Sequence, residues 1–396
     1  MIKLAKSLTI PKRAIRVINI ASYIPRKCGI ATYTKDLTNA INLLNPYSLA
    51  EIMAVNEPNS NHDYPWEVKF RINQDDLRSY LDAASYINQS GTQIVHLQHE
   101  FGLFGGSEGE YIVQLVKHIK KPLIITLHTV LDNPRPNMVR MIQELASSGQ
   151  IVTVMVRVAA QRLMRRYEIP KRKIFIISHG VPDVPFGSSL PFKEKLGLGT
   201  YKIMGVINLL SRNKGLEYAI SAVPKILKKF PNFLFLVIGE THPQVKRTEG
   251  ESYRRELGAQ VKKLKIEKNV RFINEYLSLD DLTTYLRSFD IYITPYLDPS
   301  QTASGTLAYA IGAGKNCIST PYLYAKEILW DGRGILVPFR NPDSIGEAAI
   351  KILESTSFAL DVQKKAYDFG RLMIWPSVAL SHLDLYQALI EKKRNK

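Results

Sequence analysis

Short apolar runs alternate with longer amphipathic stretches along almost the whole chain. In the first half, the apolar runs predict strands at 16–21, 51–56, 92–98, 122–128, 150–156 and 173–178. Between them, apolar residues recur at helical spacing and predict helices at 31–44, 77–87, 110–121 and 156–169. Because the strands are apolar throughout rather than alternating, the pattern favours a parallel sheet that helices cover on both faces.

The segment 182–200 interrupts this alternation with Pro, Gly and Ser residues, which are typical of a junction between domains. A second series of strands and helices follows it. Two such series predict an α/β protein of two Rossmann-like, doubly wound domains that face each other across a cleft. The expected boundaries are a first domain at 1–185, a linker at 186–200 and a second domain at 201–374. In such folds ligands bind beyond the carboxyl ends of the strands, so polar and glycine residues there are the candidates for function.

The charge of the chain is its first unusual property. Of 396 residues, 53 are Lys or Arg and 36 are Asp or Glu, which gives a formal net charge of +17. Such a surface attracts polyanions, namely phosphates, nucleic acid or an anionic membrane, although it also occurs as a plain solvated surface. Because the sequence has no zinc-finger spacing and no RNA-binding signature, we do not expect nucleic acid as a partner.

The cysteine content and hydropathy indicate the compartment. The two cysteines, Cys28 and Cys317, exclude a disulfide framework and favour a reducing environment. No run approaches the ~20 apolar residues that span a bilayer, and the first residues lack the apolar block of a secretory signal. We therefore expect a cytoplasmic protein without a membrane span.

Four candidate residues of the first half follow or end predicted strands. Gly29 opens the helix after the first strand, where a glycine lets a ligand approach free helix amides or serves a tight turn. His99 and Glu100 end the third strand before a glycine-rich loop at 102–106, and His128 ends the fourth. A buried histidine satisfied by a carboxylate is the alternative, but two histidines on adjacent strand ends favour a site.

Motifs for other chemistries are absent from the sequence. It contains neither G-x-G-x-x-G nor G-x-x-x-x-G-K-[ST], which disfavours a dinucleotide dehydrogenase and a P-loop nucleotidase. It also lacks H-E-x-x-H and Cys/His ligand spacing, so we expect no zinc site.

The second half contains a predicted phosphate site. Lys214 lies where a strand-end loop enters a helix, with Arg212 nearby. A lysine at a helix N-terminus opposes the macrodipole unless an anion is bound or the side chain points into solvent. After a later strand, Ser304, Gly305 and Thr306 combine a helix cap, exposed amides and a hydroxyl. Together with Lys214, these residues predict a diphosphate cradle without a metal.

With these residues in view, the chain resembles retaining glycosyltransferases of the B-fold type, most closely glycosyltransferase family 4 (group 1), over nearly its whole length. The resemblance rests on the segments TLHT (126–129), LLSRNKGLEYA (209–219), VIGETHP (237–243), VRFINEYLSLDDL (270–282), the loop at 298–314 and IWPSVALSHLDLY (374–386). The last resembles the family's closing segment, which implies that 375–396 form a helix crossing back to the first domain.

The resemblance implies transfer of a hexose from a nucleoside-diphosphate sugar to a saccharide or lipid-linked acceptor, with retention of configuration and without a metal or other cofactor. Mannose or glucose is the favoured sugar. The second domain would bind the nucleotide and the first would present the acceptor, with His99 and Glu100 on the acceptor side.

Individual roles also follow from the resemblance. Gly29 would approach the donor phosphate and His128 would touch the transferred sugar. Lys214 and the backbone of residues 304–306 would bind the diphosphate, and Tyr276 would flank the base.

The sequence departs from the family at three positions. Gln301 and Tyr309 stand where the family usually has two glutamates, and Leu209 stands where it usually has an arginine. The usual ribose anchor and one phosphate contact are therefore missing. We expect Glu240, at another strand end, to hold ribose or sugar hydroxyls and Arg212 to supply the missing charge; a capped turn is the alternative for Glu240.

Three other interpretations stay open. The same scaffold serves glycoside phosphorylases, which use inorganic phosphate, and a relative without catalytic activity would bind ligand without turnover. Peripheral contact with an anionic membrane is the third, because basic residues gather near both ends. These are Lys3, Lys6, Lys12, Arg13 and Arg16, together with the segment 391–396.

Overall fold

The structure is a computed structural model that describes residues 14–394, and these divide into two compact units. Unit 1 contains the described chain up to Ser178 together with α15 (Trp375–Arg394), and unit 2 runs from His179 to Ile374. Residues 186–200, the expected linker, lie inside unit 2. Within them α6 (Leu190–Lys195) is fixed by its buried Lys193, whose Nζ lies 2.7 Å from the Asp290 carboxylate. The sequence analysis could not predict this ion pair, because it considered only the Pro and Gly content of the segment and the two residues are 97 positions apart.

Unit 1 is built on a parallel sheet with the strand order β3-β2-β1-β4-β5-β6-β7. The strands are β1 (Val17–Ala21), β2 (Glu51–Asn56), β3 (Val68–Asn73), β4 (Ile94–His99), β5 (Leu123–Leu127), β6 (Ile151–Val154) and β7 (Ile174–Ile176). Every residue of β1, β4 and β5 is buried, as expected of central parallel strands. The sequence analysis missed β3, an edge strand whose exposed residues alternate with partly buried ones, so it has no continuous apolar run.

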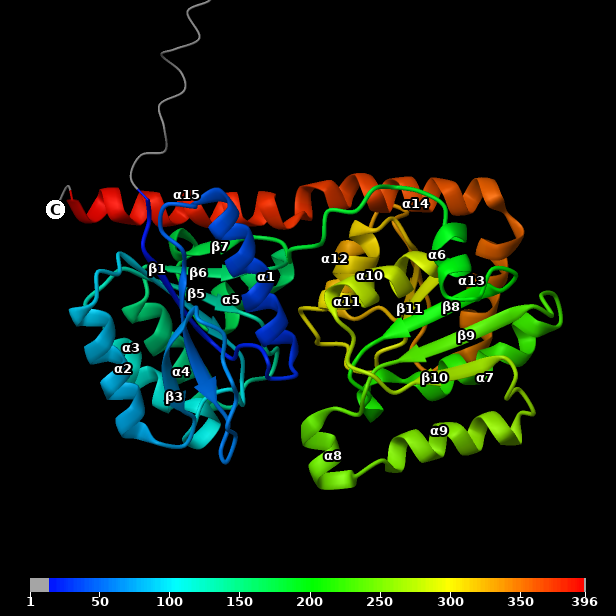
Figure 1. Cartoon of the computed structure of the whole chain (residues 1–396), viewed down its shortest axis with the longest axis horizontal. Coiled ribbons are helices and arrows are strands. Elements are labelled where there is room, and N and C mark those ends of the chain that lie inside the picture. The colour runs from blue at the N-terminus through cyan, green and yellow to red at the C-terminus, as the bar shows by residue number, and fades with distance from the viewer. Residues whose placement is uncertain (1–13, 395–396) are drawn as a thin grey trace, which may run out of the picture. The chain divides into compact units, whose positions relative to one another are not determined.

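Helices cover both faces of this sheet (Figure 1). They are α1 (Gly29–Leu44), α2 (Leu77–Gln89), α3 (Tyr111–His118), α4 (Pro136–Ser148), α5 (Arg157–Arg166) and α15. α1 packs against α15, while α2, α3 and α4 pack side by side in order. The basic residues Lys3, Lys6, Lys12 and Arg13 lie outside the described residues, as do the last two residues of the tail.

Unit 2 repeats this plan with the strand order β10-β9-β8-β11-β12-β13. Its strands are β8 (Lys202–Ile207), β9 (Phe233–Ile238), β10 (Val270–Ile273), β11 (Ile291–Thr294), β12 (Asn316–Ser319) and β13 (Ile335–Leu336). Its helices after α6 are α7 (Leu216–Leu227), α8 (Pro243–Glu249), α9 (Ser252–Lys263), α10 (Leu279–Ser288), α11 (Gly305–Gly312), α12 (Leu323–Ile328), α13 (Pro342–Glu354) and α14 (Thr356–Gly370). One apolar core joins β8, β9 and β11 to α7, α9 and α13. The predicted pair of Rossmann-like, doubly wound domains is confirmed.

Both sheets reverse their strand order at one point. In unit 1 the reversal lies between β1 and β4, and in unit 2 it lies between β8 and β11. The loops after these strands diverge there and leave room for a ligand at the carboxyl edge of the sheet. Within residues 14–394, no helix combines the length and the apolar character needed to cross a membrane.

Candidate functional site

In unit 2, the loops after β8 and β11 lie against each other at the point where the strand order reverses. The short 3-10 helix Arg212–Lys214 leads into Gly215, whose φ of 61° is left-handed. A Cβ at Gly215 would stand 2.2 Å from the Pro295 carbonyl oxygen, so only glycine allows this approach. The Leu297 amide also donates to the Asn213 carbonyl at 2.9 Å. The position of Lys214 is therefore fixed by backbone on both sides.

Lys214 lies over an aromatic stack that leads to the N-terminus of α11. Its Nζ is 4.0 Å from the centroid of the Tyr296 ring, a cation–π contact. Tyr296 stacks on Tyr322 at 5.2 Å, and the Tyr322 phenol hydrogen-bonds with the side chains of Thr294 and Ser304. Two tyrosine rings thus link Lys214 with Ser304, and their joint role as a diphosphate cradle stays a prediction. The pKa of the neighbouring His242 is lowered, mainly by burial and secondly by the positive charge of Lys214.

The first turn of α11 offers its backbone rather than its side chains. Ser304 caps the helix by accepting a hydrogen bond from the Leu307 amide at 3.4 Å, and Thr306 hydrogen-bonds with the buried Tyr292 phenol. A Cβ at Gly305 would lie 3.0 Å from His179 Nε2, so a larger residue would crowd that ring. The first N–H groups of a helix lack partners within it, so those of α11 are available to an anion.

The remaining predicted donor residues also follow strands of this sheet, but their side chains differ in availability. Glu240 follows β9, and the half-exposed Tyr276 follows β10. Gln301 donates through Nε2 to the Ala303 carbonyl at 2.7 Å, which stabilises its own loop.

Arg212 does not point to the predicted site. Its guanidinium makes two hydrogen bonds of 2.6 Å to Glu256 and one of 3.1 Å to Glu249, and these pairings raise its pKa. The expectation that Arg212 supplies a missing phosphate contact is not supported by this arrangement, because two carboxylates already neutralise its charge.

In unit 1, Gly29 is the first residue of α1, and Cys28 caps this helix by accepting a hydrogen bond from the Ala31 amide at 3.4 Å. Gly29 has no left-handed φ, and a Cβ there would meet no heavy atom within 4 Å. The turn itself therefore does not require a glycine. This favours the interpretation in which the missing side chain leaves room for a ligand at the helix amides.

His99 is a core residue. It is 1% exposed, its ring packs against Phe101 and Phe104, and neither ring nitrogen has a hydrogen-bond partner in the described part of the chain. Burial lowers its pKa to about 4, which keeps the imidazole neutral at ordinary pH. A role of His99 on the acceptor side is therefore not supported.

Unlike His99, the adjacent Glu100 has hydrogen-bond partners for its side chain. Its carboxylate accepts hydrogen bonds from Thr129 Oγ1 at 2.8 Å and from the Phe101 amide at 2.9 Å. Burial nevertheless raises its pKa to about 7. Glu100 can therefore change its protonation state near neutral pH, which a core histidine such as His99 cannot do.

His128 belongs to a buried polar network. Its Nε2–H donates to Gln98 Oε1 at 2.9 Å, and its ring lies edge-on to Tyr33 of α1 at 4.7 Å. Gln98 Nε2 lies 3.1 Å from His96 Nε2. His96 continues the network through Nδ1 to the Tyr386 phenol at 2.7 Å, so the network reaches α15.

The sequence analysis overlooked His96 and Gln98. Both are 0% exposed and lie two residues apart, so they share one face of β4. Polar side chains on an otherwise apolar central strand are the signal that could have identified them, because buried polar groups need partners. The partner Tyr386 could not be found in this way, since it lies 290 positions from His96 in the chain.

Comparison with known proteins identifies the class of unit 2. Residues 190–369 match the model of the family "Glycosyl transferases group 1". This part of the chain is therefore similar to group 1 glycosyl transferases. The resemblance inferred from the sequence motifs is thereby confirmed, and the matched region includes Lys214 and the first turn of α11.

The individual relatives of this chain are distant. A phosphatidyl-myo-inositol mannosyltransferase of Mycolicibacterium smegmatis is 25% identical over 179 residues, which are 44% of this chain and 42% of that protein. The chain thus spans less than half of that relative's length. The solved sucrose-phosphate synthase of Thermosynechococcus elongatus has a TM-score of 0.76 at 16% identity, covering 95% of this chain and 100% of that one. The Anabaena protein HepE, solved with UDP and glucose, has a TM-score of 0.73 at 12% identity, covering 94% of this chain and 99% of that one. Both solved structures have the same fold as this chain.

No metal centre is evident in the region that the structure covers. Among residues 14–394, no group of three or more His, Cys, Asp or Glu side chains is arranged to hold a metal ion. Activity without a metal remains a prediction.

Proposed function

We propose that this protein transfers a hexose, with mannose or glucose favoured, from a nucleoside-diphosphate sugar to a saccharide or lipid-linked acceptor, with retention of configuration. The observation that carries the proposal is the position of Lys214. Its ammonium lies 4.0 Å from the Tyr296 ring, at the point where the strand order reverses, and the aromatic stack below it leads to the helix cap Ser304. A cation beside helix amides suits a diphosphate.

The relatives support the same class of substrate. One is named a mannosyltransferase, one a sucrose-phosphate synthase, and one was solved with UDP and glucose. Because these proteins are at most 25% identical to this chain, the sugar, the nucleobase and the acceptor are part of the proposal.

The chemical step is departure of a nucleoside diphosphate from the anomeric carbon, which leaves an oxocarbenium-like sugar. Negative charge grows on the leaving phosphate, so the residues that lower the barrier are Lys214 and the first amides of α11. One such preorganised donor typically contributes ~3–4 kcal/mol, or about 10²–10³ in rate. The acceptor hydroxyl gives its proton to the departing phosphate, so the step requires no separate base, metal or cofactor.

On unit 1 the proposal assigns Gly29 to the donor phosphate and His128 to the transferred sugar. The space around Gly29 and the fixed ring of His128 support these assignments. In the same proposal Tyr276 flanks the nucleobase and Glu240 takes the place of the usual ribose anchor.

A release assay tests the proposal. The full chain is incubated with a panel of nucleoside-diphosphate hexoses, and the freed nucleotide is measured with and without saccharide acceptors. We expect release with at least one donor, faster release with an acceptor, and an NMR spectrum in which the product keeps the anomeric configuration of the donor. Absence of release with every donor would contradict the enzymatic proposal and favour a relative that only binds ligand.

A glycoside phosphorylase is the second candidate, because Gln301 occupies a usual glutamate position and its amide is bonded to its own loop. Thermal stabilisation separates the two functions. A nucleoside diphosphate should raise the melting temperature more than inorganic phosphate does, whereas the reverse order would favour the phosphorylase.

We also propose a cytoplasmic location with peripheral contact to an anionic membrane, carried by the basic residues near both ends. Arg16, Lys392 and Lys393 are exposed among the described ones. Sedimentation with anionic vesicles that is lost at high salt would support this contact, and sedimentation unaffected by salt would argue against it.

A further inference from the structure

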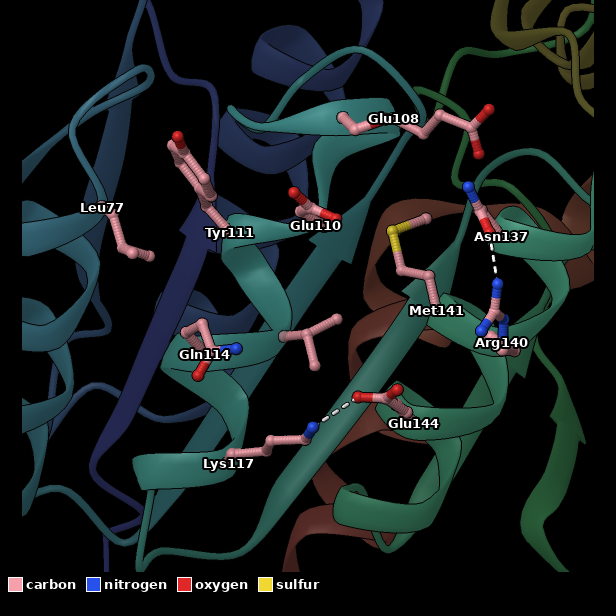
Figure 2. Close-up of a pocket in the computed structure, with 12 residues that line it drawn as sticks. Leu77, Glu108, Glu110, Tyr111, Gln114, Lys117, Asn137, Arg140, Met141 and Glu144 are labelled. Atoms are coloured by element: carbon pink, nitrogen blue, oxygen red, sulfur yellow. Dashed lines mark hydrogen bonds and ion pairs between the residues drawn. The ribbon is translucent and has the colours of Figure 1, made fainter.

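A groove on unit 1 is unused by the residues discussed so far. It lies between α3 and α4, has a volume of about 420 Å³, and begins beside the 3-10 helix Ser107–Gly109 that follows the loop after β4 (Figure 2). Figure 2 shows Lys117 of α3 reaching toward Glu144 of α4, with Gln114 on α3 and Met141 on α4. Its size falls in the range of ligand sites in proteins.

The glycine-rich loop at 102–106 packs against Tyr111, the aromatic residue that lines the groove. A Cβ at Gly106 would stand 2.7 Å from Tyr111 Cδ1, and one at Gly105 would stand 3.0 Å from Tyr111 Cδ2. The Tyr80 ring packs edge-on against Tyr111 at 5.8 Å, and its hydroxyl accepts a hydrogen bond from the Gly105 amide at 3.0 Å. The two glycines therefore allow a rigid tyrosine to line the groove.

Ion pairs stabilise both ends of the groove. At one end Glu108 adopts a left-handed φ of 58° and its carboxylate pairs with Arg135 at 2.6 Å, which joins the loops that follow β4 and β5. Non-glycine residues rarely adopt this conformation, and at Glu108 the ion pair with Arg135 accompanies it. At the other end Lys117 pairs with Glu144 at 2.5 Å across the two helices.

The lining is nearly neutral although the chain is strongly basic. Three acidic side chains (Glu108, Glu110 and Glu144) and two basic ones (Lys117 and Arg140) line the groove, while the whole chain has a formal charge of +17. Its floor is apolar, since Val113 is 6% and Met141 is 5% exposed. Such a lining disfavours phosphate groups but suits a neutral polyhydroxylated ligand, whose C–H faces pack on apolar and aromatic residues while its hydroxyls meet polar side chains.

We propose that this groove binds a neutral saccharide and thereby holds the non-reacting part of the acceptor. Tyr111 provides the face on which a sugar ring stacks, and Gln114, Asn137 and Arg140 exchange hydrogen bonds with its hydroxyls. The inference rests on the proposed transfer to a saccharide acceptor and adds the site that recognises the acceptor away from the reacting hydroxyl.

The test uses the full chain without donor and saturation-transfer NMR with methyl α-mannoside, methyl α-glucoside and the corresponding α-linked disaccharides. We expect at least one disaccharide to bind the wild type and to lose its signal in Gln114→Trp, which fills the groove from an exposed position. Tyr111→Ala should weaken binding about tenfold, as loss of an aromatic anchor does. Tyr47→Ala, which removes a 78% exposed tyrosine of the same unit, is the matched control and should bind as the wild type does.

Nucleotide release from a nucleoside-diphosphate sugar without acceptor separates this inference from the proposed function. Release unchanged in Gln114→Trp, with disaccharide binding lost and near-ultraviolet dichroism retained, supports the groove. Equal disaccharide binding in the wild type and Gln114→Trp, or no binding by a wild type that releases nucleotide, would overturn it. A wild type that binds disaccharide through the groove but releases no nucleotide would overturn the proposed transfer instead.

Discussion

The substitution Gln98→Leu tests whether the buried network positions His128. Gln98 is 0% exposed, its Oε1 accepts from His128 Nε2 at 2.9 Å, and its Nε2 lies 3.1 Å from His96 Nε2. Leucine has a similar volume but makes neither hydrogen bond. The variant therefore removes the Gln98 partner of the buried His128 Nε2–H, whereas His96 Nε2 keeps Thr126 Oγ1 at 2.7 Å.

The expected magnitudes follow from these two contacts. A buried polar group that loses its partner costs about 1–3 kcal/mol, so the free energy of unfolding should fall by about that amount. If His128 contacts the transferred sugar, its ring also loses the bond that orients it. A displacement of about 1 Å in a positioned group can lower the rate about 10²-fold. We therefore expect kcat of sugar transfer to fall much more than the affinity for the nucleotide.

Urea unfolding and steady-state transfer kinetics measure the two effects. The matched control is Thr153→Val. Thr126 Oγ1 lies 2.7 Å from His96 Nε2 and 2.6 Å from Thr153 Oγ1, so Thr153, which is 1% exposed, lies at the far end of the same network. This variant should lose stability while retaining kcat. Wild-type kcat in Gln98→Leu, together with the expected loss of stability, would refute a positioning role and leave Gln98 with a purely structural one.

Three further predictions concern titration, charge and backbone. Because burial raises the pKa of Glu100 to about 7, the folded protein retains this proton where the unfolded chain, with a pKa near 4.5, has lost it. The stability of the wild type relative to Glu100→Gln should therefore fall as pH rises through this window, and urea unfolding at about pH 5 and about pH 8 should show no such difference if the carboxyl is not perturbed. Arg212→Gln should lower donor affinity far less than Lys214→Ala in calorimetric titration, because the Arg212 guanidinium already binds two carboxylates. Equal losses of donor affinity in the two variants would show that Arg212 does contact the donor. Gly239→Ala should lower the free energy of unfolding by about 1–3 kcal/mol or more, because φ is 133° and the new Cβ would stand 1.8 Å from the Asn208 carbonyl oxygen; an unchanged urea midpoint would contradict this.

Much of the fold could be predicted because central parallel strands are continuous apolar runs. This is true of β1, β5 and β9, whose residues are all buried. The strand β3 could not be found in this way, since an edge strand that is partly exposed has no such run. The segment around α6 was expected to be a linker, and its ion pair between Lys193 and Asp290 could not be found from the sequence because the two residues are 97 positions apart.

The candidate site was predictable in place but not in detail. The rule that ligands bind at the carboxyl ends of parallel strands identified Lys214 and residues 304–306 from the sequence. The partners of individual side chains depend on contacts across the fold. Arg212 binds glutamates 37 and 44 positions away, and the core position of His99 follows from the rings that pack around it.

The most direct test of the account is calorimetric titration of the full chain with nucleoside diphosphates and the corresponding monophosphates. The account predicts tighter binding of a diphosphate and a loss of about tenfold to a hundredfold in Lys214→Ala, as expected for a hydrogen bond to a charged group. Lys202→Ala, an exposed lysine at the opposite end of β8, should bind as the wild type does. Undiminished diphosphate affinity in Lys214→Ala would contradict the proposed site at the carboxyl edge of unit 2.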